Sequence, residues 1–136
     1  QTSEKGNQKL IINLPPRHGK SQFITKVFPF WWLLNRPDSR VIISAYNSKL
    51  AELFGRELLG MFKQHAGRYG LELNQSQKSK SEFVTNKNGC VTAVGVGGSL
   101  TGKGADLIIV DDPIKNDAEA MKHWKRSYEK GWEPKL

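Results

Sequence analysis

The segment that most constrains the fold is an apolar run, Lys9–Leu14, followed closely by the tripeptide Gly19–Ser21 (Gly-Lys-Ser). The run predicts a buried strand that stops at two prolines, and a helix is expected to begin within the tripeptide. A strand, a loop and a helix in this order are typical of a phosphate-binding loop, in which backbone N–H groups wrap the phosphates. The positive end of the helix dipole points at the same anion. The first glycine of the standard G-x-x-x-x-G-K-[ST] pattern is replaced by Leu14.

The loop residues suggest separate roles at a bound nucleotide. Lys20 is expected to reach the β- and γ-phosphates, and the hydroxyl of Ser21 is expected to ligate Mg²⁺. Arg17 can reach the γ-phosphate and stabilise transition-state charge, with a solvated loop arginine as the alternative. His18 is better suited to packing of the loop. The expected binding residues for ATP and Mg²⁺ are Pro16, Arg17, His18, Gly19, Lys20 and Ser21.

A second motif places two acids at the end of an apolar strand. Asp106–Val110 predicts a buried strand that leads into Asp111 and Asp112. In phosphoryl-transfer NTPases the first acid of such a motif holds Mg²⁺, and the next carboxylate can orient or deprotonate the attacking water. We therefore expect Asp111 to join Ser21 at the metal, and Asp112 to be catalytic together with Arg17. A turn that merely closes the strand is the alternative, which the upstream loop disfavours.

Between the two motifs, strands alternate with helices. Further strands are expected at Arg40–Tyr46, Glu82–Thr85 and Cys90–Val94, with a hairpin turn at Asn86–Gly89 and a loop at Gln75–Lys80. A helix is expected from Asn47 or Ser48 to Gly67 or Gly70, and a last helix is expected from Asn116. This alternation predicts an α/β architecture with a mainly parallel sheet flanked by helices. A nucleotide would then lie at the carboxyl ends of the strands.

Two of the expected helices show apolar faces. The first carries Phe23, Ile24, Val27 and Phe28 on one face, and Pro29 should kink or end it because proline removes a helix hydrogen bond. The second carries an apolar stripe at Leu50, Leu53, Phe54, Leu58, Met61 and Phe62.

Composition restricts the class of protein. The 136 residues suit one domain, and the formal net charge of +8 favours a polyanionic partner, of which nucleic acid is the usual one. A basic surface without such a partner is the alternative. No apolar run approaches the roughly 20 residues of a membrane span. Cys90 is alone, so an internal disulfide is excluded and an intracellular setting is the default.

Three segments together resemble the ATPase domain of the large terminase subunit of tailed bacteriophages or prophages. They are Pro15–Ser21, Ile42–Asn47 and Gly98–Pro113, and the Thr-Gly-Lys-Gly-Ala-Asp run inside the third is the most specific. The resemblance implies a P-loop NTPase fold of the additional-strand, RecA-like type, in a motor that packs viral DNA. Lys103 lies in the glycine-rich loop Thr101–Gly104 beside the second motif, where a cation could touch DNA or the phosphates of a neighbouring subunit, with a solvated lysine in a plain connection as the alternative. Relatives often have arginine at this position, so the lysine departs from the family pattern for a trans-acting finger.

The resemblance also implies binding partners and domain boundaries. It implies double-stranded DNA, a small terminase subunit and a portal as partners, a homo-oligomeric ring, and the bacterial host cytoplasm as location. Residues 1–136 are expected to be an N-terminal ATPase domain, incomplete at its C-terminus, without the nuclease domain and weak or inactive as an ATPase by itself. A helicase-like DNA-dependent ATPase and a non-catalytic nucleic-acid or assembly module that retains the fold are the rival hypotheses.

Overall fold

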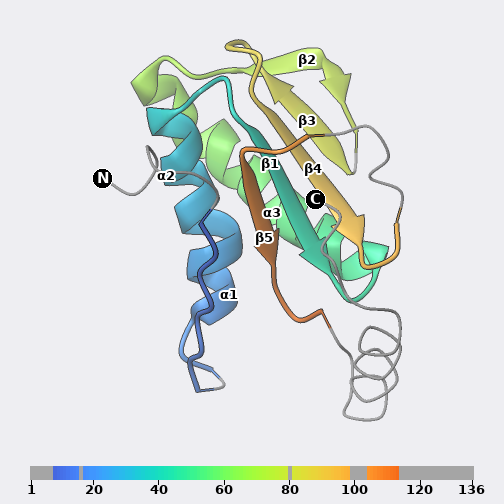
Figure 1. Ribbon diagram of the computed structural model, residues 1–136. Coiled ribbons are helices and arrows are strands. Elements are labelled where there is room, and N and C mark those ends of the chain that lie inside the picture. Colours follow the sequence, from blue (N-terminus) through green and yellow to red (C-terminus); the bar gives the residue numbers. More distant parts are fainter. Residues whose placement is uncertain (1–7, 16, 80, 99–103, 114–136) are drawn as a thin grey trace.

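The computed structural model describes residues 8–15, 17–79, 81–98 and 104–113. Its elements follow in the order α1 (Lys20–Gln22), the π-helical segment η1 (Phe23–Val27), α2 (Phe28–Asn35), β1 (Arg40–Ala45), α3 (Ser48–His65), the 3₁₀ segment η2 (Ala66–Tyr69), β2 (Leu73–Lys78), β3 (Glu82–Thr85), β4 (Cys90–Gly95) and β5 (Leu107–Val110) (Figure 1). Pro16, Lys103 and the helix expected from Asn116 lie outside the described residues.

The five strands form one mixed sheet in the order β2-β3-β4-β1-β5. β1 pairs in parallel with β4 and β5, whereas β3 pairs antiparallel with β2 and β4. The expectation of a mainly parallel sheet is therefore wrong for one half of the sheet. The hairpin that reverses the chain contains Asn88 in the left-handed region, at φ 65°, just before Gly89.

The expected loop at Gln75–Lys80 is also wrong, because most of it belongs to β2. β2 pairs antiparallel with β3, the next strand along the chain, which gives its backbone groups hydrogen-bond partners. The polar composition of this segment predicted a loop, because backbone pairing and not the burial of apolar side chains stabilises the strand.

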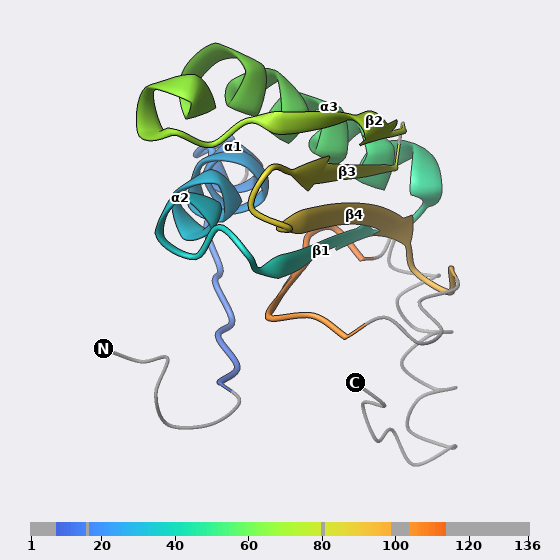
Figure 2. The ribbon, with the colours of Figure 1, turned by 90° about the horizontal axis from the view of Figure 1, so that it is seen from above.

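The described helices α1, α2 and α3 lie on one side of the sheet, as Figure 2 shows. The hydrophobic core fills the space between them and the inner face of β1, β3 and β4. Its residues, all less than 9% exposed, are Phe30, Leu33, Val41, Ile43, Ala45, Ala51, Phe54, Leu58, Phe62, Ala66, Leu71, Phe83, Val91 and Ala93. On the opposite face of β5, Ile108 and Val110 are exposed.

The second expected helix is confirmed as α3. Asn47 caps it, since its side chain accepts a hydrogen bond of 2.8 Å from the N–H of Leu50. Phe54, Leu58 and Phe62 are buried beneath it, but Leu53 remains exposed on the outer side of the helix.

The apolar face expected for the first helix is wrong. Phe23 and Val27 are 55% and 40% exposed, whereas Thr25, Pro29 and Leu33 are buried. The helix continues past Pro29 by widening into a π-helical turn, in which the N–H of Phe28 bonds to the carbonyl of Phe23. That widening changes which side chains face the core.

The strand expected at Lys9–Leu14 is not formed. This segment is irregular, and the side chains of Leu10 and Ile11 are 83% and 85% exposed. In the described part of the chain no strand pairs with this segment, so its apolar side chains are not buried against the sheet (Figure 1).

None of the described helices is both long enough and apolar enough to span a membrane.

Candidate functional site

The structure brings the two sequence motifs together through one ion pair. Lys20 Nζ lies 3.3 Å from Asp111 Oδ1. Lys20 comes from the first turn of the helix after the loop, and Asp111 directly follows β5. The lysine side chain is 32% exposed, whereas the carboxylate is only 3% exposed. The loop cation therefore contacts a buried acid at the end of the sheet.

Asp111 is held in place by the strand next to it. Its N–H donates to the carbonyl of Ser44 in β1 over 2.9 Å, which extends the parallel pairing of β5 by one residue. In parallel pairing the carboxyl ends of neighbouring strands meet at the same edge. The pairing of β5 with β1 thus places Asp111 beside the end of β1.

Within the described part of the chain, one oxygen of Asp111 has no hydrogen-bond partner. This atom, Oδ2, is buried, while Oδ1 faces Lys20. A buried carboxylate oxygen normally has a partner, because leaving it unpaired costs free energy. An oxygen ligand of this kind suits Mg²⁺, which protein sites hold through one or two carboxylates, with water and phosphate completing the shell. Among the described residues no group of three or more His, Cys, Asp and Glu side chains could hold a metal alone.

The loop before the helix contains two residues in the left-handed region of backbone conformation, Gly19 at φ 74° and Arg17 at φ 64°. The carbonyl of Gly19 then accepts the N–H of Phe23 over 3.0 Å, which closes one α-helical turn before the π-helical segment begins. Arg17 and His18 are exposed, and Ser21 is partly buried one residue beyond Lys20.

Asp112 differs from its neighbour in both exposure and backbone conformation. It is exposed, and its φ of 46° lies in the left-handed region that an L-residue adopts at a cost. Its carbonyl accepts the N–H of Tyr46 over 2.9 Å, which ties this conformation to the end of β1. Two of the expected site residues, Arg17 and Asp112, thus carry strained backbones, a feature that clusters at functional sites.

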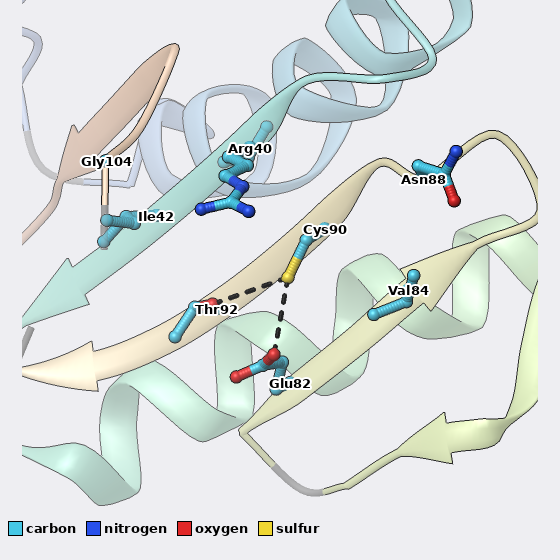
Figure 3. A pocket seen from close by; sticks show the side chains of 9 residues that line it. Arg40, Ile42, Glu82, Val84, Asn88, Cys90, Thr92 and Gly104 are labelled. Atoms are coloured by element: carbon cyan, nitrogen blue, oxygen red, sulfur yellow. Dashed lines mark hydrogen bonds between the residues drawn. The ribbon is translucent and has the colours of Figure 1, made fainter. Parts of the chain in front are cut away.

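A separate pocket lies at the other end of the strands. It encloses about 260 Å³ and is lined in part by Arg40, Glu82, Asn88 and Cys90. Figure 3 shows Arg40, Glu82 and Cys90 at the starts of β1, β3 and β4, with Asn88 in the turn before β4; Cys90 Sγ donates to Glu82 Oε1 over 3.6 Å. Because Asp111 follows the opposite end of β5, this pocket is not part of the candidate site.

Sequence reasoning missed one buried residue beside the loop. Thr25 is fully buried, and its Oγ1 donates to the carbonyl of Ser21 over 2.6 Å. Its position four residues after Ser21 is the spacing at which a threonine can bond back within a helix. That spacing was the available signal.

Comparisons with known proteins identify the family. No curated protein and no solved structure matches the chain significantly. The family described as terminase large subunit, T4likevirus-type, N-terminal, matches residues 11–132, a range that includes the loop, Asp111 and Asp112. Such a match points to a DNA-packaging terminase. Since it covers most of the sequence, the chain belongs to the family of N-terminal domains of the large terminase subunit of T4-like viruses.

Proposed function

We propose that this chain is the ATP-binding and ATP-hydrolysing part of a DNA-packaging motor, with the P-loop ATPase fold of the additional-strand type. The observation that supports it best is the 3.3 Å contact between Lys20 Nζ and Asp111 Oδ1. It joins the glycine-containing loop to the acid that ends β5, which are the phosphate and metal sides of a P-loop site. Residues 1–136 would then be an N-terminal ATPase domain, and a nuclease domain would belong to the complete subunit.

In this proposal Lys20 changes its partner when a nucleotide binds. Its ammonium group leaves Asp111 Oδ1 for the β- and γ-phosphate oxygens, while backbone N–H groups of Gly19 and its neighbours donate to the phosphates. Asp111 and the hydroxyl of Ser21 would hold Mg²⁺, and the unpaired Oδ2 supplies a ligand that is already buried. Mg²⁺ would neutralise charge on the phosphates during transfer. Pro16 and His18 would belong to the phosphate-binding loop around the nucleotide.

Asp112 and Arg17 are the proposed catalytic residues. The exposed carboxylate of Asp112, one residue beyond the metal-binding acid, would accept a proton from the attacking water. The exposed guanidinium of Arg17 would stabilise charge on the γ-phosphate. By family resemblance, Lys103 would contact DNA or a neighbouring subunit.

Titration of the chain with ATP and Mg²⁺ tests the binding site. We expect Lys20→Ala to weaken binding at least tenfold, because a charge-assisted hydrogen bond is lost. Lys26→Ala removes a lysine from the following helical turn and should leave the affinity unchanged. Circular dichroism on each variant checks that the helices are retained. Equal affinity of the wild-type and Lys20→Ala chains, or no binding by the folded wild-type chain, would refute the assignment.

Turnover distinguishes the motor from a non-catalytic module. In the complete subunit, Asp112→Asn should lower the hydrolysis rate by 10²-fold or more while ATP binding persists. A rate equal to that of the parent would remove Asp112 from catalysis. An unaltered subunit that binds ATP but never hydrolyses it would favour the non-catalytic assembly module. Family membership weighs against the helicase-like alternative.

We further propose double-stranded DNA as a partner, with a small terminase subunit and a portal assembling with a ring of complete subunits in the host cytoplasm. The charge of +8 supports a polyanionic partner. If lysines and arginines neutralise phosphates, the logarithm of the DNA affinity must fall linearly with the logarithm of the salt concentration. Affinity that stays constant between low and high salt would contradict this contact.

A further inference from the structure

The helix that follows the loop changes its winding close to Ser21. Only three residues, Lys20–Gln22, are α-helical before the π-helical segment Phe23–Val27 begins. Pro29 explains the change, because it has no N–H and, in a regular α-helix, its ring would collide with the carbonyl of Thr25. A π-helical turn opens that space. The first turn, which carries Ser21, is therefore short and adjoins an irregular segment.

Thr25 links the π-helical segment back to this first turn. Its hydroxyl donates to the carbonyl of Ser21 over 2.6 Å, at the short end of the range for O–H···O hydrogen bonds. The side chain is 0% exposed, so water cannot replace the bond. The hydrogen bond also restrains the peptide group that follows Ser21, and with it the backbone from which the Ser21 side chain projects.

We propose that Thr25 is a positioning residue, which fixes the backbone of Ser21 so that the serine hydroxyl meets Mg²⁺ in the nucleotide complex. The inference rests on the proposed function, because the metal belongs to that site. Thr25 itself touches neither nucleotide nor metal, and its effect passes entirely through Ser21. Its contribution should therefore depend on Mg²⁺, on the Thr25 hydroxyl and on the Ser21 hydroxyl.

ATP affinity of the whole chain, measured with Mg²⁺ and again with EDTA, tests these dependences. Thr25→Val keeps the shape and removes the hydroxyl, and Thr25→Ser keeps the hydroxyl. Thr25→Val should weaken ATP binding about fivefold in Mg²⁺, the effect of one typical hydrogen bond, and by less than twofold in EDTA. Thr25→Ser should restore the wild-type affinity within about twofold. Thr85→Val is the matched control, since Thr85 is also buried and bonds through its hydroxyl to the carbonyl of Pro37.

A double-mutant cycle with Ser21→Ala completes the test. Without the serine hydroxyl, Thr25→Val should cause no further loss of affinity in Mg²⁺, because nothing remains to be positioned. A fivefold loss that persists in the Ser21→Ala background, or appears equally in EDTA, would show a merely structural role and overturn the inference. Wild-type binding that needs Mg²⁺ but is unaffected by Thr25→Val would overturn the inference alone. A folded wild-type chain that binds no ATP would overturn the proposed function and the inference with it.

Discussion

Replacing Lys20 by Met tests how strongly the ion pair with Asp111 holds the loop against the sheet. At the observed 3.3 Å, two unit charges attract by about 5 kcal/mol if the effective dielectric constant is ~20. The lysine is 32% exposed, so water screens part of this attraction. The carboxylate is 3% exposed, and removing its partner leaves it poorly solvated. We therefore expect Lys20→Met to lower the free energy of unfolding by about 2 kcal/mol.

Urea denaturation of the chain gives this free energy, and a thermal scan should show a melting temperature lower by roughly 6–10 °C. The pair is isolated by a double-mutant cycle with Asp111→Asn, for which we expect a coupling of about 1–2 kcal/mol. Lys26→Met is the matched control and should change stability by less than about 0.5 kcal/mol. If the effects of Lys20→Met and Asp111→Asn on the free energy of unfolding were additive within about 0.3 kcal/mol, the ion pair would not stabilise the fold, and the reasoning above would be refuted.

Substitutions at four further positions test other parts of the structure. Gly95→Ala should destabilise by about 2 kcal/mol or more in urea, because its Cβ would lie 2.4 Å from the backbone N of Ser48. Gly60→Ala meets nothing within 4 Å and should stabilise α3 by roughly 0.5–1 kcal/mol in the same assay. Asn47→Ala removes the helix cap and should cost about 1 kcal/mol, with Asn47→Asp close to wild type, as thermal unfolding would show. Asp112→Gly should raise stability by about 0.5–1 kcal/mol by relieving the left-handed conformation at φ 46°, while a measured loss would contradict the strain.

Local signals predicted much of the fold. β1 and α3 were predicted because β-branched residues, a helix cap and an apolar stripe act within one segment. The failures concern strand pairing and helix winding, which side-chain patterns do not show. β2 is polar and is stabilised by pairing with β3, the next strand along the chain, and the segment Lys9–Leu14 lacks a partner strand among the described residues. The exposed face of the first helix follows from the π-helical turn before Pro29, which no helical periodicity can anticipate.

For the candidate site, the sequence named candidate residues but not how they meet. It assigned Lys20 to the phosphates and Asp111 to the metal, and the 3.3 Å contact between their side chains is a finding of the structure. The unpaired oxygen of Asp111 and the strained backbone of Asp112 could not be predicted, because both depend on how β5 docks on β1. Thr25 was overlooked because a threonine four residues after another helical residue can bond back to its carbonyl but need not do so, and only the structure shows that this one does.

The place of β5 at the end of the strand order has a consequence for work in solution. In the described part of the chain β5 has a neighbour on one side only, and its exposed residues include Ile108 and Val110. Neither lysine nor proline interrupts the strand, although these residues commonly discourage strand addition at a sheet edge. A second molecule could extend the sheet there, so the chain should self-associate as its concentration rises. Because β5 also leads into Asp111 and Asp112, pairing at its edge would determine whether nucleotide binding is measured on single molecules or on associated ones.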